Sequence, residues 1–180
     1  MTARDEVSGT VRVSMSSGML EYLGRDTLVD FMTRYPQVRV QIRLSSQRID
    51  LINERIDVAF RVATRFDTDQ SLAMRSLGVG ARILAASPTL LQRMGGAPAQ
   101  LEDLSRFPTL SVGDMLERDR WEFANDAGET CDFHHAPHIS CGDLQLICEA
   151  AVAGQGVVLL PEHICEPEVR SGRLVHILPQ

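Results

Sequence analysis

The chain contains no lysine, so all 18 of its basic residues are arginines. They are outnumbered by 24 acidic residues, and the formal net charge is −6. A protein that binds nucleic acid needs clustered basic side chains to neutralise phosphates. This acidic balance argues against a chain that binds DNA or RNA by itself.

Long apolar runs are also missing. No segment approaches the roughly 20 consecutive apolar residues that cross a bilayer. The first nine residues, MTARDEVSG, lack the apolar core of a signal peptide. We therefore predict a cytoplasmic protein that does not bind membranes. In that compartment we expect reduced thiols rather than disulfides at the four cysteines, which are Cys131, Cys141, Cys148 and Cys165.

Recognisable catalytic and cofactor motifs are absent as well. The sequence has no G-x-S-x-G turn, no glycine-rich dinucleotide or phosphate loop, and no H-E-x-x-H pair. We predict that the chain is not an enzyme and that it holds no cofactor and no metal.

The most informative segment spans residues 40–63, VQIRLSSQRIDLINERIDVAFRVA. Alternating apolar residues predict a strand that ends at Leu44, a short helix around residues 49–52, and a second strand that includes Val58. The turn between the first strand and the helix is rich in serine rather than glycine. It offers hydroxyls and backbone N–H groups to a small ligand, but no phosphate cradle.

The preceding residues complete a βαβαβ order. Residues 10–15 alternate as a strand, and residues 19–35 predict one helix that Pro36 ends. We expect this helix to bury an apolar stripe made of Leu20, Leu23, Leu28, Phe31 and Met32. Such an order predicts a parallel sheet with right-handed crossovers.

A second α/β region follows the polar loop at residues 64–70. We expect strands at residues 72–77, 81–86, 109–112, 120–123, 157–160 and 172–176, and a hairpin arm and strand within 129–140. We expect helices at residues 88–94, after the N-cap Asp143, and after Pro161. The predicted organisation is a lead-in at 1–8, a first lobe at 9–63, a second lobe at 64–175, and the start of a return to the first lobe at 176–180.

Several segments carry a family resemblance in their order and spacing. They are GTVRVS at 9–14, FMTRYPQVRVQIRLS at 31–45, IDLINERIDVAFRVA at 49–63, LAASP at 84–88, WEF at 121–123, AVAGQGVVLLP at 151–161 and SGRLVHILP at 171–179. Together they resemble the effector-binding domain of LysR-type transcriptional regulators.

That resemblance implies two Rossmann-like α/β lobes of the type 2 periplasmic-binding-protein kind, with a ligand cleft between them. It implies a small-molecule effector, a homodimer or larger homo-oligomer, and DNA binding only through an N-terminal winged helix-turn-helix domain that this sequence does not include. The segment after residue 176, which in the family returns to the first lobe, is also cut short here.

The predicted effector site lies where strands end and helices begin, because ligands in open α/β sheets bind beyond the carboxyl ends of the strands. A helix N-terminus suits a carboxylate, so a small organic acid is the expected effector. The same serines, and Asp143, could also serve only as N-caps. The predicted residues are Ser14, Ser16, Ser17, Gly18, Ser45, Ser46, Arg61, Thr64, Gly142 and Asp143.

Three other functions fit parts of the sequence. A solute-binding protein of the transport class would have the same fold and cleft. A deaminase of porphobilinogen type would need a cofactor-bearing cysteine and clustered arginines, and neither is visible. A metal or redox sensor would use the residues between Cys131 and Cys148. That segment holds Cys131, His134, His135, His138 and Cys141, but Pro137 interrupts it and a strand would point these side chains in different directions.

Overall fold

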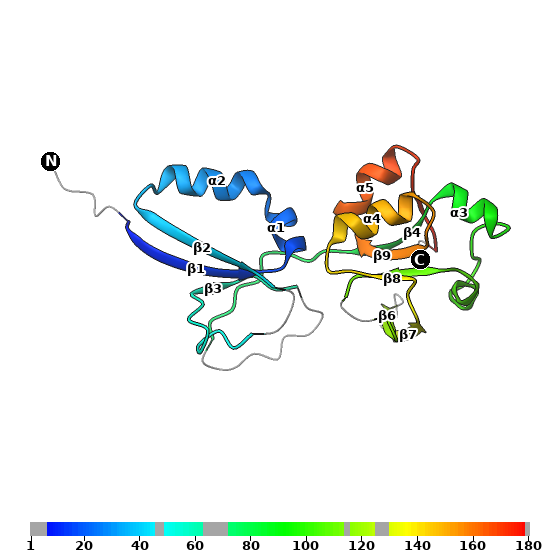
Figure 1. Ribbon diagram of the computed structural model, residues 1–180, viewed down its shortest axis with the longest axis horizontal. Coiled ribbons are helices and arrows are strands. Elements are labelled where there is room, and N and C mark those ends of the chain that lie inside the picture. Colours follow the sequence, from blue (N-terminus) through cyan, green and yellow to red (C-terminus); the bar gives the residue numbers. More distant parts are fainter. Residues whose placement is uncertain (1–6, 46–48, 63–71, 114–115, 125–129, 179–180) are drawn as a thin grey trace. The chain divides into compact units, whose positions relative to one another are not determined.

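A computed structural model describes residues 7–45, 49–62, 72–113, 116–124 and 130–178. By its internal contacts the chain divides into two compact units, residues 1–75 and 76–180. Figure 1 shows the elements of both units, coloured along the sequence. Within the described residues, no helix is long and apolar enough to cross a bilayer.

The first unit is built on three parallel strands. They are β1 (Gly9–Met15), β2 (Val38–Leu44) and β3 (Val58–Ala59), in the order β2-β1-β3. Two helices, α1 (Ser17–Leu23) and α2 (Arg25–Arg34), lie on one side of this sheet (Figure 1). The small core combines Val13 and Met15 of β1 with Met19 of α1. The three strands run parallel as predicted, but the predicted βαβαβ order is incomplete, because the described residues between β2 and β3 hold a single turn and no helix.

The single helix predicted at residues 19–35 is wrong. Gly24 has a φ of 80°, a left-handed conformation that favours glycine, and it ends α1 before α2 begins. The predicted buried stripe is also wrong for α2, which has no buried residue. Phe31 and Met32 expose 39% and 46% of their surface, and neither belongs to the small core.

The short helix predicted after the serine-rich turn is one capped helical turn. The Asp50 carboxylate accepts hydrogen bonds from the N–H groups of Ile52 and Asn53 at 3.1 and 3.0 Å. Arg55 adopts a φ of 53° and ends the turn. The Ile56 N–H donates to the Leu51 carbonyl at 2.8 Å, which is the closing bond of a Schellman motif.

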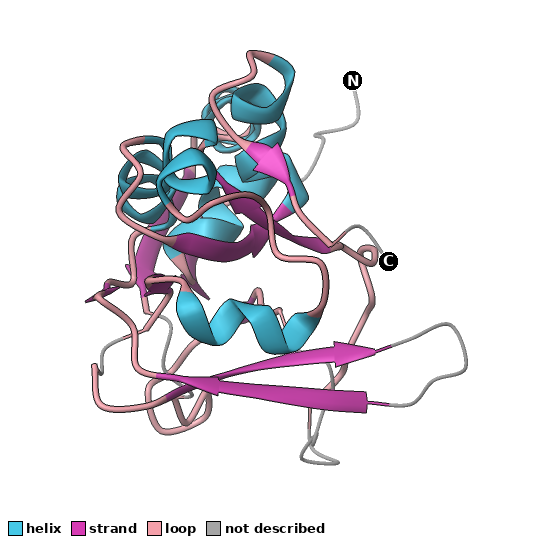
Figure 2. Ribbon diagram, turned by 90° about the vertical axis from the view of Figure 1, so that its right-hand side faces the viewer, coloured by secondary structure: helices cyan, strands magenta, loops and turns pink. Residues whose placement is uncertain are grey.

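The second unit contains a mixed five-stranded sheet of order β10-β4-β9-β5-β8. Its strand β4 runs antiparallel to both neighbours, while β5 is parallel to β8 and β9. The remaining strands, β6 and β7, form an antiparallel hairpin. Figure 2 distinguishes the helices from the strands. The strands are β4 (Arg82–Ala86), β5 (Thr109–Ser111), β6 (Asp119–Ala124), β7 (Thr130–His135), β8 (Ile139–Ser140), β9 (Val157–Pro161) and β10 (Val175–His176).

Helices cover both faces of this sheet. Helices α4 (Leu144–Val152) and α5 (Glu162–Arg170) pack on Val158 and Leu160 of β9. On the opposite face, α3 (Pro88–Arg93), the 3-10 helix η1 (Leu101–Arg106) and the β6–β7 hairpin pack on Val157 and Leu159. The continuous apolar run of β9 therefore reflects burial on both sides.

Two local predictions differ from the structure. Residues 72–77 form no strand, and the large apolar side chains among them are exposed, because no ladder partner pairs with them among the described residues. Pro161 is the last residue of β9 and precedes α5 instead of opening the helix from inside.

Candidate functional site

Arg61, two residues beyond β3, is anchored to the end of β1. Its Nη2 donates to the Ser14 hydroxyl at 2.8 Å, and its Nη1 donates to the carbonyls of Ser14 and Phe60 at 3.1 and 2.9 Å. Ser14 is fully buried. Its carbonyl also accepts the Phe60 N–H at 2.8 Å, so the strand ladder and the arginine are tied to the same residue.

A cavity of about 200 Å³ lies at the carboxyl ends of these strands. Ser16 and Ser45 are polar residues of its wall, and Arg61 contributes a positive charge. The Ser45 N–H donates to the Met15 carbonyl at 2.9 Å, which holds the end of β2 against the end of β1. Phe60 and Val62 complete the wall with apolar surface.

Arg61 is the main source of positive charge at this cavity. Burial lowers the pKa of Arg61 from its ordinary value, although an arginine stays protonated at neutral pH. A guanidinium has five N–H donors, and three hydrogen bonds from Arg61 are made within the described residues. The other two donors make no hydrogen bond to the part of the chain that the structure describes. Helix α1 has only seven residues, so its dipole adds less than the sequence argument assumed.

The predicted residues divide into several groups. Ser16, Ser45 and Arg61 line one cavity, and Ser14 lies beneath it as the anchor of Arg61. Ser17 and Gly18 form the first turn of α1. Ser46 and Thr64 lie outside the described residues.

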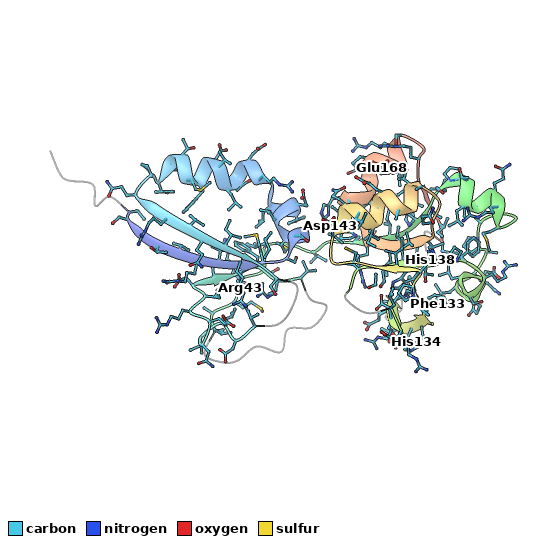
Figure 3. The ribbon with its side chains drawn as sticks, in the orientation of Figure 1. Arg43, Phe133, His134, His138, Asp143 and Glu168 are labelled. Carbon is cyan, nitrogen blue, oxygen red and sulfur yellow. The ribbon has the colours of Figure 1, made fainter. Side chains whose placement is uncertain are left out.

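Gly142 and Asp143 belong to the second unit, where Asp143 is the N-cap of α4. Its carboxylate accepts the N–H groups of Gln145 and Leu146 at 2.9 and 3.0 Å. Figure 3 labels Asp143 at the start of this helix. The prediction that Asp143 caps a helix is confirmed, and both of its donors come from the helix itself.

Sequence reasoning missed Phe60 as a cavity residue. The signal was available, because Phe60 precedes Arg61 at the end of a predicted strand, where ligands of α/β sheets bind. Val62, on the other side of Arg61, also lines the cavity and exposes 83% of its surface.

The cysteine–histidine segment is distributed over the hairpin and the strand that follows it. Cys131 and His134 of β7 are exposed, whereas the side chain of His135 is only 5% exposed. His134 lies on the outer part of the hairpin (Figure 3). Among the described residues, no group of three or more His, Cys, Asp or Glu side chains could hold a metal ion. The strand alternation separates these side chains, as the sequence suggested.

The four cysteines are free thiols. Cys148 of α4 is buried in the same core cluster as Cys165 of α5, while Cys141 accepts the Asp143 N–H at 3.4 Å. The neighbouring Cys148 and burial raise the pKa of the Cys165 thiol. A thiol of raised pKa is a poor nucleophile, so Cys165 has the character of a core residue.

Comparison with known families decides what these units belong to. The protein-family model described as "LysR substrate binding domain" matches residues 4–180 of this chain. The chain belongs to the LysR substrate-binding-domain family. The prediction drawn from the sequence segments is therefore confirmed.

The most similar relatives include two regulators of Escherichia coli K12. The HTH-type transcriptional regulator DmlR is 29% identical over 98% of this chain and 57% of its own length. The HTH-type transcriptional activator TtdR is 30% identical over 96% of this chain and 54% of its own length. The chain thus spans about half the length of the curated LysR-type relatives that it matches.

Solved LysR-type structures show the same fold. The full-length virulence activator AphB of Vibrio cholerae has a TM-score of 0.82 at 28% identity, covering 97% of this chain and 58% of that one. The regulatory domain of AphB from Vibrio vulnificus has a TM-score of 0.80 at 26% identity, covering 95% of this chain and 84% of that one. The predicted fold class, two α/β lobes of the periplasmic-binding-protein type, is confirmed.

The family also decides between the predicted functions. LysR-type proteins are transcriptional regulators that bind small-molecule effectors, form oligomers and bind DNA, and the matched relatives are named as regulators. The prediction of a LysR-type effector-binding domain that is not an enzyme is confirmed. The solute-binding and deaminase alternatives are not favoured.

Proposed function

We propose that the cavity formed by Ser16, Ser45 and Arg61 is the first-unit half of the effector site. The observation that carries this proposal is the guanidinium of Arg61, which is anchored on Ser14 and lines a cavity of about 200 Å³ together with Ser16 and Ser45. An arginine fork pairs well with a planar carboxylate. The effector is then a small organic acid whose carboxylate binds Arg61.

The remaining predicted residues are proposed to complete the site. Ser17, Gly18, Ser46 and Thr64 would extend it within the first lobe, and Gly142 and Asp143 would contribute from the second. The two donors that the Asp143 carboxylate accepts come from its own helix, so an effector hydroxyl or amine would meet its remaining lone pairs. The proposed domain limits remain residues 9–63 and 64–175.

Regulation would follow from differential affinity. An effector that binds one arrangement of the two lobes more tightly shifts the population toward that arrangement. In the whole protein this change would pass through a homodimer or larger homo-oligomer to an N-terminal DNA-binding domain. A regulator of transcription works in the cytoplasm, which is the location we propose.

Binding of matched carboxylates and amides to this chain tests the proposal. Short organic acids and their uncharged amides would be titrated into the wild type, Arg61→Lys and the control Arg39→Gln. We expect at least one acid, and none of the amides, to raise the melting temperature of the wild type, because a ligand of the folded state stabilises it. Arg61→Lys should lower the affinity for that acid by about 10- to 100-fold, since lysine keeps the positive charge but lacks the paired N–H donors of the guanidinium.

Arg39 is an exposed arginine on β2 that does not line the cavity, and its loss should leave binding unchanged. Equal affinity of the wild type and Arg61→Lys for the acid would show that Arg61 does not bind it.

A further inference from the structure

The first unit carries a second polar surface, on the side of its sheet that faces away from α1 and α2. Side chains alternate along a strand, and Val13 and Met15 of β1 pack into the core beneath α1. Arg12 therefore lies on the opposite face, where it is in register with Gln41 of β2. Arg43, two residues further along β2, lies on the same face (Figure 3).

A cavity of about 320 Å³ is formed between this face and the capped turn at residues 50–56. Arg12 and Arg43 line it from the sheet, and Glu54 and Arg55 line it from the turn. This cavity shares none of its lining residues with the cavity at Arg61. The two are therefore separate places on the same small sheet.

The charges of this cavity are not balanced. Arg43 forms an ion pair with Glu54. Within the described residues, neither Arg12 nor Arg55 has an ion-pair partner, so three arginines and one glutamate leave a charge of +2 on the lining. The Asp57 carboxylate, which accepts the backbone N–H of Arg12 at 2.7 Å, adds one negative charge beside the cavity but is not a lining residue.

The backbone at Arg55 adds a second observation. With a φ of 53°, Arg55 takes the left-handed conformation that glycine adopts most easily at the end of a helical turn. A side chain at this position makes the turn harder to form. Arg55 therefore brings a guanidinium to the cavity at a position where local backbone preference favours glycine.

We propose that this cavity is a second ligand site that binds a small organic dianion through the unpaired guanidinium groups of Arg12 and Arg55. Each arginine offers a fork of N–H donors to one oxyacid group, either a carboxylate or a phosphate. Gln41 adds an amide that can donate to the same ligand. The volume is at the lower end of the range for small-molecule sites, so the ligand is a short molecule and not a nucleotide.

Calorimetric titration of this chain with succinate, inorganic phosphate and uncharged succinamide tests the site. The ionic strength is held constant with chloride, because general screening also affects exposed charges. The proteins are the wild type, Arg12→Gln, Arg55→Gly and the control Arg39→Gln. Arg39 precedes Gln41 by two residues on the same face of β2 and lies outside the cavity.

We expect saturable binding of succinate or phosphate by the wild type and the control, and no binding of succinamide. The anion that binds shows whether the site accepts a carboxylate or a phosphate. Arg12→Gln and Arg55→Gly should each weaken binding at least tenfold. Arg55→Gly should also melt at the same temperature as the wild type or higher, because glycine suits the left-handed backbone, so its loss of binding cannot come from unfolding.

Three results would overturn the proposal. They are the absence of saturable binding by both anions, wild-type affinity in Arg12→Gln and Arg55→Gly, and an equal loss of affinity in Arg39→Gln. The variant Arg61→Gln distinguishes binding at this second site from binding at the proposed effector site. It should leave this binding intact, whereas loss of binding in Arg61→Gln alone would place the anion in the other cavity.

Discussion

Arg61 and Ser14 are 47 positions apart in the sequence and are joined by two hydrogen bonds, one to the Ser14 hydroxyl at 2.8 Å and one to its carbonyl at 3.1 Å. Ser14 is fully buried at the end of the central strand, and Arg61 follows the edge strand β3. These two bonds fix the position of the Arg61 guanidinium at the end of the sheet. The buried Ser14 hydroxyl thereby orients an arginine that lines a cavity.

Replacing Ser14 with alanine tests this anchoring role. Ser14→Ala removes the hydroxyl that accepts from Arg61 and should lower the free energy of unfolding by about 1–2 kcal/mol. Because Arg61 also loses its fixed orientation, binding of an organic acid should weaken with it. Urea unfolding and acid titration measure the two effects. Thr33→Ala is the control, since Thr33 is exposed and its hydroxyl donates to the Val29 carbonyl of its own helix at 2.9 Å.

Asp143 should contribute to stability as the N-cap of α4. Asp143→Ala removes the acceptor of two backbone N–H groups and should destabilise the chain by about 0.5–2 kcal/mol. Asp143→Asn keeps a capping oxygen and should recover most of the loss in thermal unfolding. An alanine variant as stable as the wild type would show that the cap contributes little.

Gly156 should tolerate no side chain. A Cβ at this position would lie 2.9 Å from both the Leu110 Cγ and the Pro108 carbonyl oxygen. Gly156→Ala should therefore destabilise the second unit by about 1–3 kcal/mol or more through overpacking. Gly172→Ala is the matched control, because its Cβ meets no atom within 4 Å and only its φ of 74° resists alanine, at about 1 kcal/mol. Chemical denaturation of both variants would compare the two costs.

His135 should make stability depend on pH. Burial lowers the pKa of His135 below the ordinary value of 6.5, the carboxylate of Asp119 opposes this shift, and His134 adds to it. The unfolded chain then binds the proton more tightly than the folded one. The free energy of unfolding is therefore highest above pH 6.5 and decreases as the pH falls below that value. The Nδ1 of His135 bonds the Thr109 hydroxyl at 2.7 Å, and the Asp119 carboxylate lies 3.8 Å from Nε2.

Urea unfolding between pH 5.5 and 7.5 measures this dependence. His135→Gln should flatten the profile in that range, while His138→Gln should keep it, since His138 is exposed. A profile that keeps its slope in His135→Gln would assign the proton uptake to other groups.

Helix α2 should mediate self-association. It has no buried residue, and Val29, Phe31 and Met32 expose 54%, 39% and 46% of their surface. An exposed apolar helix face of this kind marks an interaction surface. Met32→Glu should shift the chain toward the monomer in sedimentation at rising concentration, and Met32→Leu should not. Equal association by both variants would exclude this helix from the interface.

The sequence predicted the elements that local rules govern. The alternation of residues 10–15 and 38–44 indicated strands, the apolar run at 157–160 indicated another strand, and Asp143 was expected to cap a helix; all three agree with the structure. The order and spacing of the matching segments were enough to identify the LysR-type domain. These features depend on periodicity and capping, which act over a few residues.

Only the tertiary structure decided what each side chain does. The sequence could not show that Gly24 splits a predicted helix and leaves Phe31 exposed, because helix periodicity says which residues share a face and not what covers that face. Nor could it show that the buried Ser14 hydroxyl accepts a hydrogen bond from Arg61, 47 positions further along the chain. It also could not bring Arg12 and Arg55 to one cavity. Such pairings join residues about 40 or more positions apart, and their geometry is set by how the sheet and its turns pack, not by the residues next to them.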